Sequence, residues 1–257
     1  MKSKRKVYII VIVVMILLSS LFFLVFGLDM IEKKNEDSTL IVGDTSFRNK
    51  GGKWTNSSLD TEKKESNWKL FQTYVDNEYF GEYYLYFSDK WYLFSKDKKA
   101  VNYDGELLAF NNKKYKVFDY DLKEIEDYSD VNIILEENGI SFIPNYTSNY
   151  YIDLDIDYDG KDERLYLISN LFPLDPVDDK IFFSIVFLKK GDKIIKLYEK
   201  KEEDAFSGCS ASISGILDLD WDNKYEIVLK CSYYSTNGTD FSLYNFSKGS
   251  FHKLVSN

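Results

Sequence analysis

The chain has 257 residues, of which 44% are hydrophobic and 17% are aromatic, so it holds enough apolar material for a packed core and is not disordered. It contains 42 acidic and 33 basic residues, and its formal net charge at pH 7 is −9. Four of the basic residues precede the first apolar run, so the rest of the chain is more acidic still. No basic face is evident, which argues against nucleic acid as a partner and favours cations as ligands.

The amino terminus predicts a membrane anchor. A basic head, MKSKRK, precedes an uncharged, mostly apolar run from Val7 to Leu28. Roughly 20 apolar residues in a helix cross a hydrocarbon core of ~30 Å, and the apolar part of a signal peptide is shorter, about 7 to 15 residues. We therefore expect residues 1–28 to form a cytoplasmic head and one transmembrane helix, with cleavage near Leu28 as the alternative. The positive-inside rule then places the remainder outside the cell membrane as an extracytoplasmic domain.

Residues 29–67 are mostly polar and predict a stalk with one short strand at most, within TLIVGDTSF. From residue 68 the pattern changes to aromatic and β-branched runs separated by two to four turn residues, which is typical of hairpins. Examples are YYLYFSDKWYLF at 83–94, ELLAFNNKKYKVFDY at 106–120 and FFSIVFLKKGDKIIKLYEK at 182–200. The expected fold class is all-β, an antiparallel β-hairpin meander, with a meander region at 68–128 and no helix outside the anchor.

Residues 129–257 contain an internal repeat of about 60 residues. The acidic stretch DIDYDGKDE at 155–163 returns as DLDWDNKYE at 218–226, and FSIVFLKKGDKIIKL at 183–197 returns as FSLYNFSKGSFHKLV at 241–255. Each copy predicts a strand, an acidic loop, a second strand and a hairpin. Four antiparallel strands are the content of a propeller blade. Two copies cannot close a propeller, so an open array and a sandwich are both compatible with the repeat.

The acidic loops predict two Ca²⁺ sites, because Ca²⁺ takes six to eight oxygen ligands at about 2.3–2.6 Å. Carboxylates at the first, third and fifth places can converge on one ion, the carbonyl at the seventh place adds an oxygen, and the ninth residue closes the site. The ligands expected in the first loop are Asp155, Asp157, Asp159, the carbonyl of Lys161, and Glu163. Those expected in the second loop are Asp218, Asp220, Asp222, the carbonyl of Lys224, and Glu226.

The turn within each loop needs a residue that accepts the left-handed conformation. Gly160 supplies it in the first loop, and Asn223, which also tolerates that conformation, stands in its place in the second. Tyr225 replaces Asp162, so the second loop has fewer carboxylates and we expect it to bind Ca²⁺ more weakly. The alternative for both loops is an acidic turn that is merely solvated.

The DxDxDGxxE pattern of these loops resembles the repeats of the FG-GAP and VCBS families, over residues 150–257 at most. An EF-hand is excluded because Tyr166 and Leu229 occupy the place of its twelfth-position Glu. The resemblance implies calcium-stabilised scaffold loops in a propeller-like surface or secreted protein that binds or adheres.

Other chemistry finds little support. The single histidine, His252, argues against a catalytic triad and against zinc bound by Cys and His. Cys209 and Cys231 lie on either side of the second acidic loop, and outside the cell they could pair, although the sequence does not show whether they come within reach.

We therefore expect a membrane-anchored calcium-binding module for an unknown surface protein or glycan, and not an enzyme. Two alternatives remain open: a surface carbohydrate hydrolase that uses carboxylates outside the loops, and a structural accessory subunit of an envelope complex.

Overall fold

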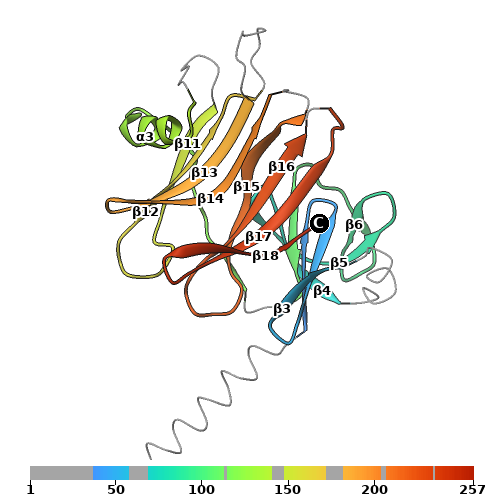
Figure 1. The fold of residues 1–257 in the computed structure, drawn as a ribbon. Coiled ribbons are helices and arrows are strands. Elements are labelled where there is room, and N and C mark those ends of the chain that lie inside the picture. Colours follow the sequence, from blue (N-terminus) through green and yellow to red (C-terminus); the bar gives the residue numbers. More distant parts are fainter. Residues whose placement is uncertain are drawn as a thin grey trace, which may run out of the picture.

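In the computed structural model the described residues are 37–57, 69–112, 115–140, 148–171, 182–203, 207–233 and 235–257 (Figure 1). They form eighteen strands and one helix, which confirms the expected all-β class with antiparallel sheets. The transmembrane helix predicted within residues 1–28 lies outside this part of the chain. Within it, no helix has the length and apolar character needed to cross a membrane.

The strands form three antiparallel sheets. The N-terminal sheet has eight strands in the order β3-β2-β1-β8-β4-β5-β6-β7. Their bounds are β1 (Ser38–Val42), β2 (Thr45–Lys50), β3 (Lys53–Asn56), β4 (Leu70–Val75), β5 (Glu78–Phe87), β6 (Trp91–Phe94), β7 (Ala100–Val101) and β8 (Leu107–Phe110).

The other two sheets each have five strands and contain the repeats. The helix-side sheet runs in sequence order through β10 (Lys123–Glu124), β11 (Ser148–Leu154), β12 (Glu163–Ser169), β13 (Phe182–Lys190) and β14 (Lys193–Glu202). The central sheet contains β9 (Lys116–Val117), β15 (Cys209–Asp218), β16 (Glu226–Tyr233), β17 (Thr239–Ser247) and β18 (Ser250–Ser256), in the order β18-β17-β16-β15-β9. Each predicted repeat thus supplies four consecutive antiparallel strands.

The central sheet is the middle layer of a three-sheet stack (Figure 1). One of its faces, including Ile216 and Ile227, shares a core with Leu154 and Val186 of the helix-side sheet. The opposite face packs on the N-terminal sheet, and the residues in that second core include Leu217, Val228, Leu40 and Phe110. Neighbouring residues of β15 and β16 therefore point into different cores, and both faces of the sheet are buried there.

The outer faces are covered in two ways. Helix α3 (Ser129–Glu137) lies over the far face of the helix-side sheet and packs Val131, Ile134 and Leu135 against a cluster that includes Phe187. The N-terminal sheet holds a further cluster of its own around Trp91 and Leu93.

The stalk predicted for residues 29–67 is wrong for residues 38–56. This segment forms β1, β2 and β3, and all five residues of β1 are buried. The segment looked polar because β3 is a largely exposed edge strand, and because the buried apolar run of β1 is short.

The meander predicted for 68–128 is only partly formed. Segment 83–94 makes the expected β5–β6 hairpin, but segment 106–120 does not close on itself. Its first half is β8, between β1 and β4, and its second half is β9, which pairs with β15 of the central sheet. The expectation of no further helix is also wrong, because residues 129–137 form α3. The sequence pattern missed this helix because its apolar residues keep helical spacing over only nine residues.

Because both faces of the central sheet are buried, two neighbouring residues of one strand should contribute similarly to the stability of the fold. Ile216 and Leu217 are both fully buried, in different cores. Ile216→Ala and Leu217→Ala should each lower the free energy of unfolding by about 2–5 kcal/mol in urea titrations. Tyr86→Ala is the control, because Tyr86 is 52% exposed and should cost little. A negligible effect of either core variant would contradict the three-layer stack.

Candidate metal centres

The two acidic loops occupy equivalent places in the two repeats. The first connects β11 to β12, and the second connects β15 to β16. Glu163 is the first residue of β12 and Glu226 is the first residue of β16. The sequence therefore placed both loops, and the strands that hold them, correctly.

The loops share an unusual backbone conformation. Gly160 and Asn223 have φ of +83° and +61°, which confirms the left-handed turn expected at this place. Two residues earlier, Tyr158 and Trp221 also have positive φ, of 59° and 65°. Such values are uncommon for bulky side chains, and they are held only where the surroundings impose them. Their recurrence at the same place indicates that both loops are built to one design.

Carboxylates of each loop fix that backbone. Asp155 accepts the N–H groups of Asp159 and Gly160 at 2.9 and 2.8 Å. In the second loop Asp218 accepts the Trp221 N–H at 2.7 Å.

Two further bonds recur in both copies. The fifth-place carboxylate accepts the N–H of the seventh-place lysine, at 3.0 Å from Lys161 and 2.8 Å from Lys224. The closing glutamate accepts the N–H of the second loop residue, Ile156 at 3.1 Å and Leu219 at 2.9 Å. The loops are thus preorganised by their own acidic side chains.

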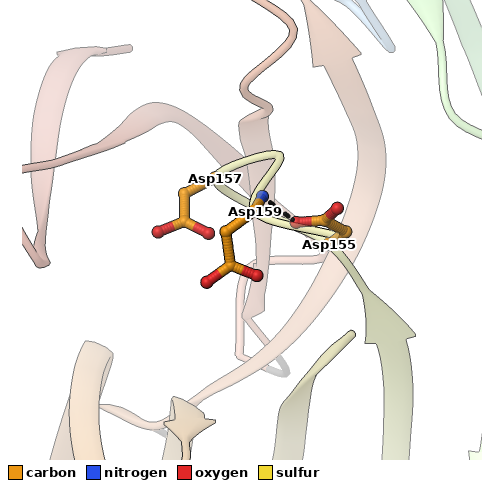
Figure 2. A group of neighbouring side chains, drawn as sticks. All are labelled: Asp155, Asp157 and Asp159. Atoms are coloured by element: carbon orange, nitrogen blue, oxygen red, sulfur yellow. Dashed lines mark hydrogen bonds between the residues drawn. The ribbon is translucent and has the colours of Figure 1, made fainter. Parts of the chain in front are cut away.

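Each loop brings its first three carboxylates together. Asp155, Asp157 and Asp159 each place an oxygen within 4.8 Å of the others, and Asp218, Asp220 and Asp222 do the same. Figure 2 shows Asp157 and Asp159 side by side, with Asp155 turned toward the loop backbone. The spacing suits one hard cation per loop. That the carbonyls of Lys161 and Lys224 are ligands remains a prediction.

A lysine that the sequence analysis did not single out occupies the first loop. Lys190 Nζ, at the end of β13, lies 2.8 Å from Asp157, 3.0 Å from Asp159 and 2.6 Å from Glu163. Burial opposes the charge on Lys190, but its hydrogen bonds to these carboxylates outweigh burial and raise its pKa. The ammonium group therefore stands where a bound cation would neutralise the loop.

In the described part of the chain, the lysine at the corresponding place of the second repeat does not make this contact. Lys190 aligns with Lys248 in the sequence repeat, yet the residue paired with Glu226 across the sheet is Asn245, three residues before Lys248. The basic partner within the loop is Lys224, which reaches Asp222 at 3.1 Å. The second hairpin is thus offset relative to its acidic loop.

With this offset, no basic group among the described residues is hydrogen-bonded to the buried glutamate of the second loop. Glu226 is 6% exposed, and burial raises its pKa well above the usual range, with Asp218, Asp220 and Asp222 adding to the effect and the Leu219 N–H opposing it. Burial also raises the pKa of Asp218. In the first loop the hydrogen bond from Lys190 offsets only part of this effect, because burial still raises the pKa of Glu163. A cation would relieve unfavourable charge in both loops, and more of it in the second, where burial raises the pKa of Glu226 well above the usual range.

The two loops touch each other across the seam between their sheets. The Tyr225 N–H donates to the Ile156 carbonyl at 3.2 Å, and both side chains pack in the core that the two sheets share. Cys209 and Cys231, on β15 and β16, are joined by a disulfide with a Cα–Cα distance of 5.5 Å. The second loop is therefore fixed to the first loop and between two cross-linked strands.

No protein-family model, curated protein or solved structure matches the chain. The resemblance to FG-GAP and VCBS repeats thus depends on the loop motif and the repeat alone.

The closing glutamates give a matched pair of variants for the metal-free protein. Glu226→Gln replaces a buried carboxyl group whose ionised form burial destabilises, and it keeps an oxygen for the Leu219 N–H. It should therefore raise stability in chelator by about 1 kcal/mol, or about 2–4 °C. Glu163→Gln breaks a charge-assisted bond to Lys190 and should lower stability by roughly 1–3 kcal/mol. Thermal melts at pH 7 compare the two. Shifts of the same sign would contradict this difference between the loops.

Proposed function

We propose that the two loops bind Ca²⁺, and that the ions stabilise a membrane-anchored extracytoplasmic β-repeat module that binds a surface protein or glycan. The observation that carries the proposal is the convergence of three carboxylates in each of two equivalent loops. A solvated acidic turn does not need the same two positive-φ residues and the same closing bond in both copies. All-oxygen ligands of this kind suit Ca²⁺ better than Mg²⁺, which demands a tighter octahedral shell.

Calcium would act at the seam between two sheets. Ile156 and Tyr225 link the loops to each other and to the core, so ordering either loop stabilises the contact between the helix-side and central sheets. Binding that requires the folded loop adds to folding stability by mass action. In this proposal the repeats are propeller-like blades that stack without closing a ring.

The second loop should be the tighter site, contrary to the ranking by number of carboxylates. In the first loop an incoming ion must displace Lys190 from three carboxylates, whereas in the second the ion neutralises a buried Glu226. In the second loop the ion competes with a single contact, from Lys224 to Asp222, so binding there should release more free energy.

A surface location is supported by two features. The disulfide is typical of oxidising compartments, and the uncharged run at 7–28 is long enough to cross a membrane. A structural accessory subunit would share both features. The hydrolase alternative would need two facing carboxylates in a cleft outside the loops.

Calcium should raise the melting temperature of the full-length chain. At about 100 times Kd the stabilisation is roughly 2.7 kcal/mol, or about 5–10 °C for a domain of this size. Asp220→Ala should remove most of the shift and Asp157→Ala less of it. Lys190→Met should tighten binding at the first loop, since it removes the internal competitor.

Magnesium at the same concentration is the matched ion control and should give a smaller shift. The proposal fails if calcium leaves the melt unchanged and calorimetry detects no binding up to several millimolar.

The predicted topology has its own test. A carboxyl-terminal tag on the full chain should be digested by protease added to intact cells, because the basic head holds the amino end inside. Recovery of most of the protein as a soluble form trimmed near Leu28 would show a cleaved signal peptide instead.

A further inference from the structure

Two neighbouring pockets lie where the N-terminal sheet meets the central sheet, and neither includes a residue of the acidic loops. The first, of about 490 Å³, is lined by residues of the β4–β5 turn, the segment after β9, and strands β15 and β16. The second, of about 360 Å³, shares Glu106 and Lys230 with the first. These two residues form a salt bridge, so the pockets are parts of one groove divided by an ion pair.

Ser214 gives the first pocket an unpaired buried hydroxyl. The register between β15 and β16 shifts between Ile213 and Gly215, so Ser214 is the extra residue of a β-bulge. It lines the pocket and is 6% exposed, and its Oγ has no hydrogen-bond partner among the residues that the structure describes. A buried polar group left unpaired costs about 1–3 kcal/mol. Bulges are frequent beside binding sites because they redirect a side chain.

Asn77 gives the same pocket an unpaired acceptor. Tyr120 donates its hydroxyl hydrogen to the Ile213 carbonyl at 2.9 Å, so its oxygen must accept from Asn77 Nδ2 at 3.1 Å. This fixes the orientation of the amide and leaves Asn77 Oδ1 buried, with no partner in the described part of the chain. The bulge, the tyrosine and the amide thus form one preorganised unit around the pocket.

The second pocket holds an unpaired donor. Trp91 lines it and is 1% exposed, and its buried Nε1–H has no partner within the described ranges. Residues that line the groove therefore carry three buried polar atoms without a hydrogen-bond partner among the described residues: an acceptor, a donor and a hydroxyl that can act as either. A ligand rich in hydroxyl groups suits such a lining, since each hydroxyl both donates and accepts.

The charge of the first pocket indicates which class of hydroxyl-rich ligand it would bind. The lining has one lysine, Lys230, which is already paired with Glu106. It has five carboxylates: Asp76, Glu78, Glu106, Asp119 and Asp121. Such a groove repels anions and attracts protonated amines. We propose that the groove binds a carbohydrate that carries free amino groups, a short amino-sugar chain. This inference rests on the binding-module part of the proposed function and supplies its ligand class.

The test uses the full-length chain in mild detergent at fixed ionic strength, titrated calorimetrically with a glucosamine tetramer. The N-acetylated tetramer, which has the same hydroxyls and no ammonium groups, should bind at least tenfold more weakly, and a galacturonate tetramer should not bind. Ser214→Ala should weaken glucosamine-tetramer binding about tenfold, the loss of one hydrogen bond to a charged or polar ligand. Its melting temperature should stay equal or rise, because the deleted hydroxyl has no partner in the free protein.

A matched pair of carboxylate variants separates the groove from general charge attraction. Glu78→Gln at the groove should weaken binding about two- to fivefold, and Glu137→Gln on α3 should leave it unchanged. The inference is overturned if the glucosamine tetramer does not bind, if the galacturonate tetramer binds equally, or if the two variants lose affinity equally.

The outcome is independent of calcium. Glucosamine-tetramer binding should persist in chelator and in Asp220→Ala, provided that the melt shows the protein folded at the assay temperature. If the sugar binds and calcium has no effect, only the proposal of metal sites is rejected. If calcium stabilises the protein and the sugar does not bind, only the proposal of a sugar-binding groove is rejected.

Discussion

Burial of both faces of the central sheet is the constraint on which the rest of the structure depends. Its strands carry apolar residues in unbroken runs, such as Ile227, Val228 and Leu229, and these alternate between two separate cores. A sheet of this kind is not stable in water by itself, because either face would expose apolar side chains. The helix-side and N-terminal sheets therefore depend on the central sheet for their inner cores, and the chain behaves as one packed unit rather than as a row of separate repeats.

Polar chemistry in such a stack is confined to its edges and seams, and the two candidate sites are at two different seams. The acidic loops lie between the helix-side and central sheets, where Tyr225 reaches Ile156. The groove lies between the central and N-terminal sheets, where Tyr120 reaches Ile213. In each case a backbone carbonyl at the seam accepts a hydrogen bond from a residue of another segment. The residues that shape each candidate site therefore also hold neighbouring segments together.

The sequence predicted what depends on local pattern. The acidic loops, the hairpins at 83–94 and 182–200, and a possible link between Cys209 and Cys231 all follow from short-range spacing, and the structure contains each of them.

The remainder depends on register and on long-range pairing, which no local pattern contains. Lys190 enters the first loop because of the pairing of β12 with β13, and Lys248 is displaced by three residues although the hairpins align in sequence. Strand β9 is only two residues long, and it is recognised as a strand by its pairing with β15. The Ser214 bulge, likewise, is visible only once β16 is in place.

The order of the layers differs from the order of the chain, and this has a consequence for biosynthesis. The N-terminal sheet is made first, the helix-side sheet second, and most of the central sheet last, from Cys209 to Ser256. A chain emerging from a ribosome or a translocation channel would thus expose two unpaired apolar faces until residues 209–256 arrive. Topologies of this kind fold late and slowly and are open to aggregation meanwhile. Loss of the carboxyl-terminal segment would remove the middle of the molecule rather than its end, and it would leave two half-built cores with nothing between them.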